Sequence, residues 1–148
     1  MIHLHVFVEG NTELNFAKKI LQPFLGYESY RVVPIQFATG EDREGRLNKG
    51  GFGFGSGRYE RIKKQINNQI NRFGKKGLRN ESHFFTTMFD LYALPNVFPG
   101  YDDAQKIYDP YLKVKKLEDS FAADINYYCF IGQVSPTGRT VFLRKLGR

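Results

Sequence analysis

The chain has 148 residues, 41% of them hydrophobic and 25% charged, and this composition excludes a disordered chain. Its single cysteine excludes an internal disulfide and a multi-cysteine zinc site. No run of 18 apolar residues and no basic, then apolar leader is present, so we expect no membrane span, no signal peptide and a cytoplasmic location.

The net charge is +7, and most of it lies in one part of the chain. Residues 41–80 hold eleven Lys or Arg against four Asp or Glu, whereas residues 81–131 carry a net charge of −4. A basic segment beside an acidic region suits a polyanion held over a bound metal ion. The alternative is a solvated surface whose charges only keep the protein in solution.

The first predicted element is a β-strand over residues 2–8, where branched apolar side chains alternate with His or Phe. It ends at Glu9-Gly10, where glycine permits a sharp turn. His3 and His5 share one face of this strand, and we interpret them as hydrogen-bonded core residues.

A helix is predicted after this turn and continues to Gly26. Asn11 or Thr12 is its expected N-cap. Glu13 falls in the first turn, where a carboxylate is favourable beside the helix dipole even without a further role. The apolar positions with helical spacing are Leu14, Ala17, Leu21 and Phe24.

A second strand is predicted over residues 30–37, and Pro34 within it favours an edge position or a bulge. Residues 38–58 read as a long loop that contains GGFGFGSG at residues 50–57. This stretch lacks the phosphate-loop pattern GxxxxGK[ST], so a mobile flap is the better interpretation. A helix follows over residues 59–73, because isoleucines recur along one side of it.

A third strand over residues 83–89 leads into Asp90, and residues 91–109 form a connection rich in proline and glycine. A helix over residues 111–123 and a short fourth strand over residues 127–131 complete the pattern. Alternating strands and helices predict an α/β fold, with a mainly parallel four-stranded sheet flanked by helices.

Three carboxylates follow from this arrangement as candidate metal ligands. Glu9 and Asp90 each end a strand, and Glu13 lies one helical turn after Glu9. Ligands of open α/β sheets bind at the carboxyl ends of the strands. Two bare carboxylates about 4 Å apart repel by roughly 4 kcal/mol at an effective dielectric near 20, and a divalent cation reverses that sign. We therefore predict a site for Mg2+ or Mn2+ held by these residues.

Four basic side chains near this site are candidates for binding a nucleic-acid backbone. Lys49 and Arg58 flank the glycine-rich stretch, and Lys63 and Lys64 lie on the helix that follows. Contacts of this kind carry no sequence information, and they make the affinity depend on salt.

The sequence resembles the Toprim domain, the metal-binding fold of topoisomerases, primases and OLD-type nucleases. The resemblance rests on residues 8–13 (VEGNTE) and on Phe89-Asp90. It implies that Glu9 and Asp90 are catalytic metal ligands, and that Glu13 matches the second acid of the OLD-type pattern EGxTE. Toprim domains usually carry Asp-x-Asp, whereas the second position is Tyr92 in this chain.

A closer resemblance is to a Toprim-like bacterial family of unknown function, often encoded beside AAA or SMC-like ATPases in settings suggestive of phage defence. Residues 8–16, the neighbourhood of residues 58–64 and residues 86–101 carry it. Residues 86–95 (TTMFDLYALP) are its most specific part, and it covers residues 1–131 as one Toprim-like domain. Residues 132–148 form a basic tail that departs from the family pattern, as expected of a truncated or frame-shifted member.

The resemblance implies a Mg2+-dependent nuclease subunit that acts on DNA or RNA with a partner ATPase. The alternative is a non-catalytic Toprim-like subunit that binds a partner ATPase or nucleic acid. Tyr92 favours the alternative, whereas the Glu9 and Asp90 pair favours the enzyme.

Overall fold

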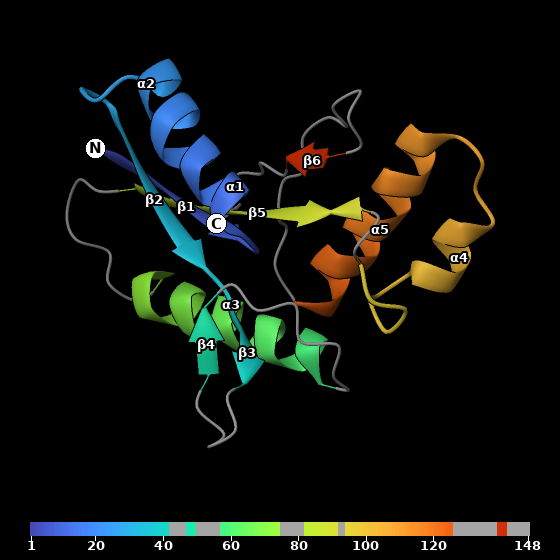
Figure 1. Cartoon of the computed structure of the whole chain (residues 1–148). Coiled ribbons are helices and arrows are strands. Elements are labelled where there is room, and N and C mark those ends of the chain that lie inside the picture. The colour runs from blue at the N-terminus through green and yellow to red at the C-terminus, as the bar shows by residue number, and fades with distance from the viewer. Residues whose placement is uncertain (42–46, 50–56, 75–81, 92–93, 126–138, 142–148) are drawn as a thin grey trace. The chain divides into compact units, whose positions relative to one another are not determined.

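The computed structural model describes residues 1–41, 47–49, 57–74, 82–91, 94–125 and 139–141 (Figure 1). The chain forms two compact units, Met1–Phe84 and Phe85–Arg148, and each is described by itself. In the described part of the chain, no helix is long and apolar enough to cross a membrane.

The core of the fold is a three-stranded parallel sheet in the order β2 (Tyr30–Gln36), β1 (Ile2–Val8), β5 (Ser82–Asp90). Strand β1 runs parallel to β2 in continuous register, and the start of β5 joins it where the Ser82 amide donates to the Met1 carbonyl at 3.2 Å. The last five residues of β1 are buried, as expected for a central strand. The predicted α/β class is confirmed.

A short strand, β6 (Arg139–Val141), runs antiparallel to the end of β5, with Asp90 opposite Arg139. It lies within the basic tail, outside the span that the resemblance covers. The fourth strand predicted over residues 127–131 lies outside the described residues.

The helical segment after β1 consists of α1 (Asn11–Phe16), a π-helical turn η1 (Ala17–Leu21) and α2 (Gln22–Leu25). Its N-cap is Gly10, with no side-chain capping bond, so the prediction of Asn11 or Thr12 as the cap was wrong. The Gly10 carbonyl accepts the first helical hydrogen bond, from the Leu14 amide at 3.1 Å.

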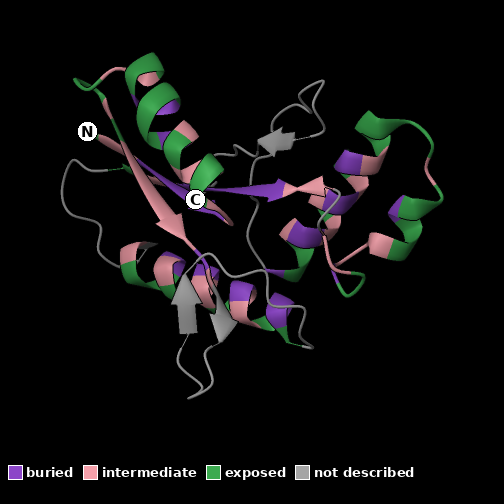
Figure 2. Ribbon diagram, in the orientation of Figure 1, coloured by how far each residue is buried: buried purple, intermediate pink, exposed green. Residues whose placement is uncertain are grey.

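The π-helical turn changes which residues of this segment face the core. It takes up an extra residue per turn and so rotates the following residues around the helix axis. Leu21 and Gln22 are buried, whereas Phe24 is 84% exposed. Most of the rest of this helical segment is exposed or intermediate (Figure 2). The predicted apolar side of this helix was therefore wrong at Phe24, because its spacing assumed an uninterrupted α-helix.

Gln22 uses its buried position to hold the outer edge of β2. Its Nε2 donates to the Tyr30 carbonyl at 3.1 Å, and its Oε1 accepts from the Val32 amide at 2.6 Å. Strand β2 lies at the edge of the sheet, as Pro34 predicted. Proline and a side-chain amide together leave this edge few backbone groups for another strand, which discourages edge-to-edge pairing.

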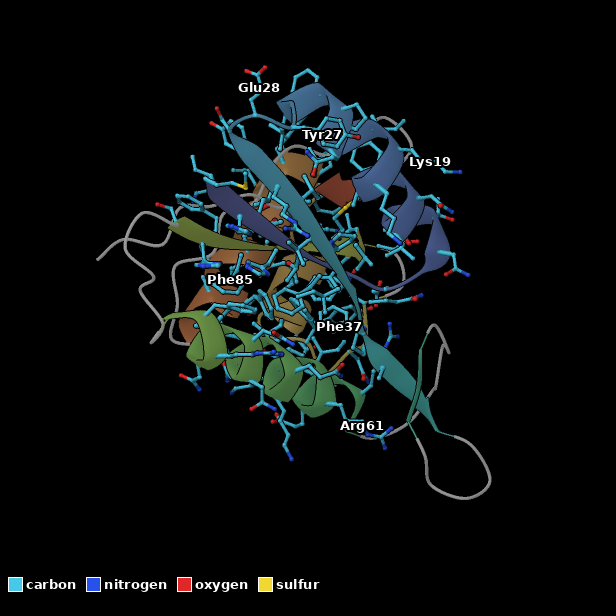
Figure 3. The ribbon with its side chains drawn as sticks, turned by 90° about the vertical axis from the view of Figure 1, so that its left-hand side faces the viewer. Lys19, Tyr27, Glu28, Phe37, Arg61 and Phe85 are labelled. Carbon is cyan, nitrogen blue, oxygen red and sulfur yellow. The ribbon has the colours of Figure 1, made fainter. Side chains whose placement is uncertain are left out.

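After Phe37, which is fully buried between the sheet and the next helix, the chain forms a hairpin (Figure 3). Strands β3 (Ala38–Glu41) and β4 (Leu47–Lys49) pair antiparallel within the stretch predicted as a loop, so that prediction was wrong for these residues. The Gln65 side chain anchors the hairpin, since it accepts from the Ala38 amide at 3.0 Å and donates to the Ala38 carbonyl at 3.2 Å. These hydrogen bonds come from a residue 27 positions further along the chain, so no local sequence pattern predicts them.

Helix α3 (Arg58–Gly74) agrees with the helix predicted over residues 59–73. Ile62, Ile66 and Ile70 are at most 2% exposed and recur every four residues, so they form its buried face. In the first unit, α3 covers one face of β1 and β2, and the α1–η1–α2 segment covers the other (Figures 1 and 3).

The second unit holds the end of β5 with α4 (Tyr101–Gln105) and α5 (Pro110–Asp124). Asp109 caps α5 by accepting from the Tyr111 and Leu112 amides at 2.8 and 3.0 Å, and α5 agrees with the predicted helix. Helix α4 lies inside the stretch predicted as an irregular connection, so that prediction was wrong for these residues. With five residues, α4 is too short to show a helical pattern in the sequence. Three rings with centroids 5.2–5.6 Å apart form the core, namely Phe89, Phe98 and Phe121.

Candidate functional site

Glu9 follows the central strand directly, and its carboxylate forms an ion pair with the guanidinium of Arg58. Both side chains are largely buried, with 9% of the Glu9 side chain and 10% of the Arg58 side chain exposed. Removing two charges from water is costly unless they compensate one another, so a pair this buried depends on both partners.

Arg58 reaches Glu9 because of where α3 begins. It is the first residue of the helix, directly after Gly57, whose φ of 99° lies in the region that favours glycine. The contact joins residues that are 49 positions apart in the chain. The sequence assigned Arg58 to a phosphate backbone and contained no signal for its contact with Glu9.

Glu13 brings a second carboxylate to the same turn. It lies in the first turn of α1, as predicted, and its side chain folds back over Gly10. A Cβ atom on residue 10 would lie 2.9 Å from Glu13 Oε2. The absent side chain of Gly10 therefore makes room for the Glu13 carboxylate beside the residue that carries the other acid.

Asp90 is the last residue of β5, so it ends a strand as predicted. Glu9 belongs to the first unit and Asp90 to the second, and the convergence of their carboxylates stays a prediction. Lys49 is the last residue of β4, and Lys63 and Lys64 lie on α3, where Lys64 is exposed. Their contact with a nucleic-acid backbone also stays a prediction.

The acids of the first unit suit Mg2+ in their chemistry. Mg2+ is held in proteins by one or two carboxylates and keeps several of its waters. Glu9 and Glu13 supply two carboxylates at the end of the central strand, and the space over Gly10 accommodates one of them. Among the described residues, no group of three His, Cys, Asp or Glu side chains is placed to hold a metal ion.

Comparison with protein families places this arrangement in a family. Residues 8–134 match the family described as "Domain of unknown function (DUF4276)". The chain belongs to the DUF4276 family. The matched span begins at the last residue of β1 and includes Glu9, Glu13, Arg58 and Asp90. No curated protein and no solved structure matches this DUF4276 chain.

A histidine cluster lies away from the acidic turn of the DUF4276 chain. His5 Nε2 and His83 Nδ1 are 3.0 Å apart, and the His3 ring stacks on His83 with centroids 4.9 Å apart. Phe73 of α3 packs against His5 with ring centroids 4.5 Å apart. The prediction that His5 is a hydrogen-bonded core residue is confirmed, and the sequence missed its partner His83.

The surroundings of His5 disfavour its charged form. The pKa of His5 is lowered to about 4, mainly by its burial and to a smaller extent by the neighbouring imidazoles of His83 and His3. At neutral pH the His5 imidazole is therefore neutral, which fits a structural role.

Proposed function

We propose that this DUF4276 domain is a Mg2+-dependent nucleic-acid phosphodiesterase, the nuclease subunit of an ATPase-linked phage-defence system. The observation that supports it most is the pair of carboxylates, Glu9 and Glu13, at the carboxyl end of the central strand. Ligands of open α/β sheets bind at this end of the strands. We further propose a cytoplasmic location and an AAA or SMC-like ATPase as partner.

The proposal includes a Toprim-like arrangement of the sheet, with a fourth strand beyond β5. Strands β1 and β5 each end next to an acid, which is the feature that the Toprim resemblance requires. In this arrangement, Asp90 joins Glu9 and Glu13 as a ligand of the cation.

In the proposed reaction, Glu9, Glu13 and Asp90 hold the cation, and Glu9 and Asp90 are the catalytic carboxylates. Mg2+ or Mn2+, when bound, supplies Lewis acidity toward the scissile phosphate and a water of lowered pKa. The carboxylates set the position of that cation at the strand ends and offset its charge.

The basic side chains of the first unit hold the substrate in this proposal. In this proposal, Lys49, Arg58, Lys63 and Lys64 contact phosphates of a DNA or RNA backbone. Lys64 is exposed on α3, as a residue that contacts a large polyanion must be. Such contacts contribute affinity without sequence preference.

The direct test is cleavage of labelled DNA and RNA with Mg2+ or Mn2+, with and without an AAA or SMC-like ATPase as the proposed partner. Cleavage by the wild-type chain should be lost in Glu9→Gln and Asp90→Asn. Glu28→Gln is a matched control, since it removes an exposed acid of the first unit near the end of α2 (Figure 3). Cleavage that survives both site variants, or that needs no divalent cation, would refute the proposal.

One observation favours a non-catalytic subunit that binds nucleic acid or a partner ATPase. The Glu9 carboxylate already has a cationic partner, Arg58, so the protein does not depend on a metal ion to offset this buried charge. In that case, nucleic acid or the ATPase would bind with and without Mg2+, and no cleavage would follow.

A further inference from the structure

The contact between Arg58 and Glu9 joins two groups that the proposed reaction assigns to different tasks. Glu9 is a proposed cation ligand, and Arg58 is a proposed phosphate contact, yet each is the other's ion-pair partner. Both side chains are about nine-tenths buried, so water solvates neither charge well. Whatever engages one of them must therefore affect the other.

A divalent cation competes with Arg58 for the carboxylate of Glu9. A guanidinium and a divalent cation on one carboxylate are like charges at close range, and low solvent exposure strengthens their repulsion. Binding of the cation is thus opposed for as long as Arg58 keeps its place against Glu9.

A backbone phosphate offers Arg58 another anionic partner of the same kind. The planar guanidinium binds phosphate and carboxylate oxygens with the same two-pronged geometry, so it can exchange one for the other. Arg58 lies at the first residue of α3, the helix that also carries Lys63 and Lys64. A nucleic-acid strand bound along these side chains would pass the N-terminal end of α3, where Arg58 lies.

We propose that Arg58 acts as a latch on Glu9. Arg58 pairs with the Glu9 carboxylate in the metal-free protein and releases it when a backbone phosphate replaces Glu9 as the partner of Arg58. Nucleic acid and cation then bind cooperatively, and the cation site is completed only when substrate is present. This inference rests on the proposed function, since it needs a cation at Glu9 and a polyanion near α3.

The first experiment measures Mn2+ binding by the electron paramagnetic resonance signal of unbound Mn2+. A short single-stranded oligodeoxynucleotide is added in one arm, and a denaturing gel checks that it stays intact. In the wild-type chain, the oligonucleotide should tighten Mn2+ binding by about fivefold or more, the usual lower range of coupling between two sites. Without the oligonucleotide, Arg58→Gln should bind Mn2+ more tightly than the wild type does. Adding the oligonucleotide should then change the Mn2+ affinity of this variant little.

Lys19→Gln is the charge-matched control for Arg58→Gln. Lys19 is exposed on η1, on the opposite side of the sheet from α3 (Figure 3), and its loss should change neither the Mn2+ affinity nor the coupling. If Arg58→Gln binds Mn2+ as the wild type does and keeps the coupling, the latch is refuted while the cation site stands. If no folded variant binds Mn2+ at all, the proposed function fails together with it.

A second measurement does not require substitution of Arg58, whose loss leaves Glu9 as a buried charge. Glu9→Gln releases Arg58 from its ion pair, so a phosphate no longer has to displace Glu9, and metal-free oligonucleotide binding should tighten by about fivefold or more. The slope of log affinity against log salt should stay as in the wild type, because the contact between Arg58 and a phosphate forms in both chains. Glu13→Gln removes the same charge nearby without touching this ion pair, and an equal change in both variants would refute the latch.

Discussion

The carboxylate of Glu13 occupies the space that a side chain on residue 10 would need, with Oε2 2.9 Å from the position of that Cβ atom. Gly10 has an extended backbone with φ −127° and ψ 179°, which any residue adopts, so its need for glycine comes from Glu13 rather than from conformation.

We expect Gly10→Ala to displace the Glu13 carboxylate, because the end of a flexible side chain yields more easily than the main chain. Thermal stability should change little, whereas Mn2+ affinity measured by titration calorimetry should fall clearly. The double variant Gly10→Ala/Glu13→Gln should then lose no more affinity than Glu13→Gln alone, since the two changes act on one contact. Additive losses would show that Gly10 acts independently of Glu13.

Gln22 should matter to stability although it is polar and lies in a helix. Gln22→Leu leaves the half-buried Val32 amide and Tyr30 carbonyl without the partners that Gln22 supplies, and each such loss costs at most the roughly 1–3 kcal/mol of a fully buried unsatisfied group. We expect a lower midpoint in urea denaturation with an unchanged slope. Phe24→Ser is the control, because Phe24 is 84% exposed and its replacement should cost little. Equal losses in the two variants would contradict the assigned role of Gln22.

Acid should destabilise the fold through His5. The pKa of His5 is about 4 in the folded chain and 6.5 in its unperturbed state, so the unfolded chain binds the proton more readily. The free energy of unfolding should therefore fall as the pH drops from about 6.5 to about 4, by about 3 kcal/mol in total. Well below pH 4 this contribution no longer changes, because His5 is then protonated in both states.

His5→Phe tests the origin of this pH dependence. The substitution keeps a ring against Phe73 and removes the titrating group, so its unfolding free energy, measured by urea denaturation from pH 7 to pH 4, should vary less with pH. A wild-type slope in the variant would assign the acid sensitivity to other groups.

The salt dependence of nucleic-acid binding distinguishes a phosphate-binding surface from a merely solvated one. Lys63→Gln/Lys64→Gln removes two neighbouring charges from α3. If both contact phosphates, the slope of log affinity against log salt should become shallower by about 1.4–1.8, depending on whether the strand is single or double. An unchanged slope with the same fold would leave these lysines as a solvated face.

The sequence predicted most elements of this fold, because their patterns are local. Alternation over residues 2–8 and the isoleucines of α3 each repeat within one element, so no knowledge of the partner element is needed. Elements without such a pattern were missed. Strands β3 and β4 are four and three residues long, and the π-helical turn η1 departs from the spacing on which the helix prediction relied.

The same division applies to the candidate site. Glu9 at the end of β1, Glu13 in the first turn of α1 and Asp90 at the end of β5 follow from the sequence alone, since each position depends on the boundary of a single element. Only the tertiary structure decided which side chains meet. Arg58 pairs with Glu9 across 49 residues, and His5 meets His83 across 78, because packing of α3 and β5 against β1 sets these contacts. Such pairs depend on how whole elements are placed, and that information is spread over many residues rather than carried by any short stretch of the chain.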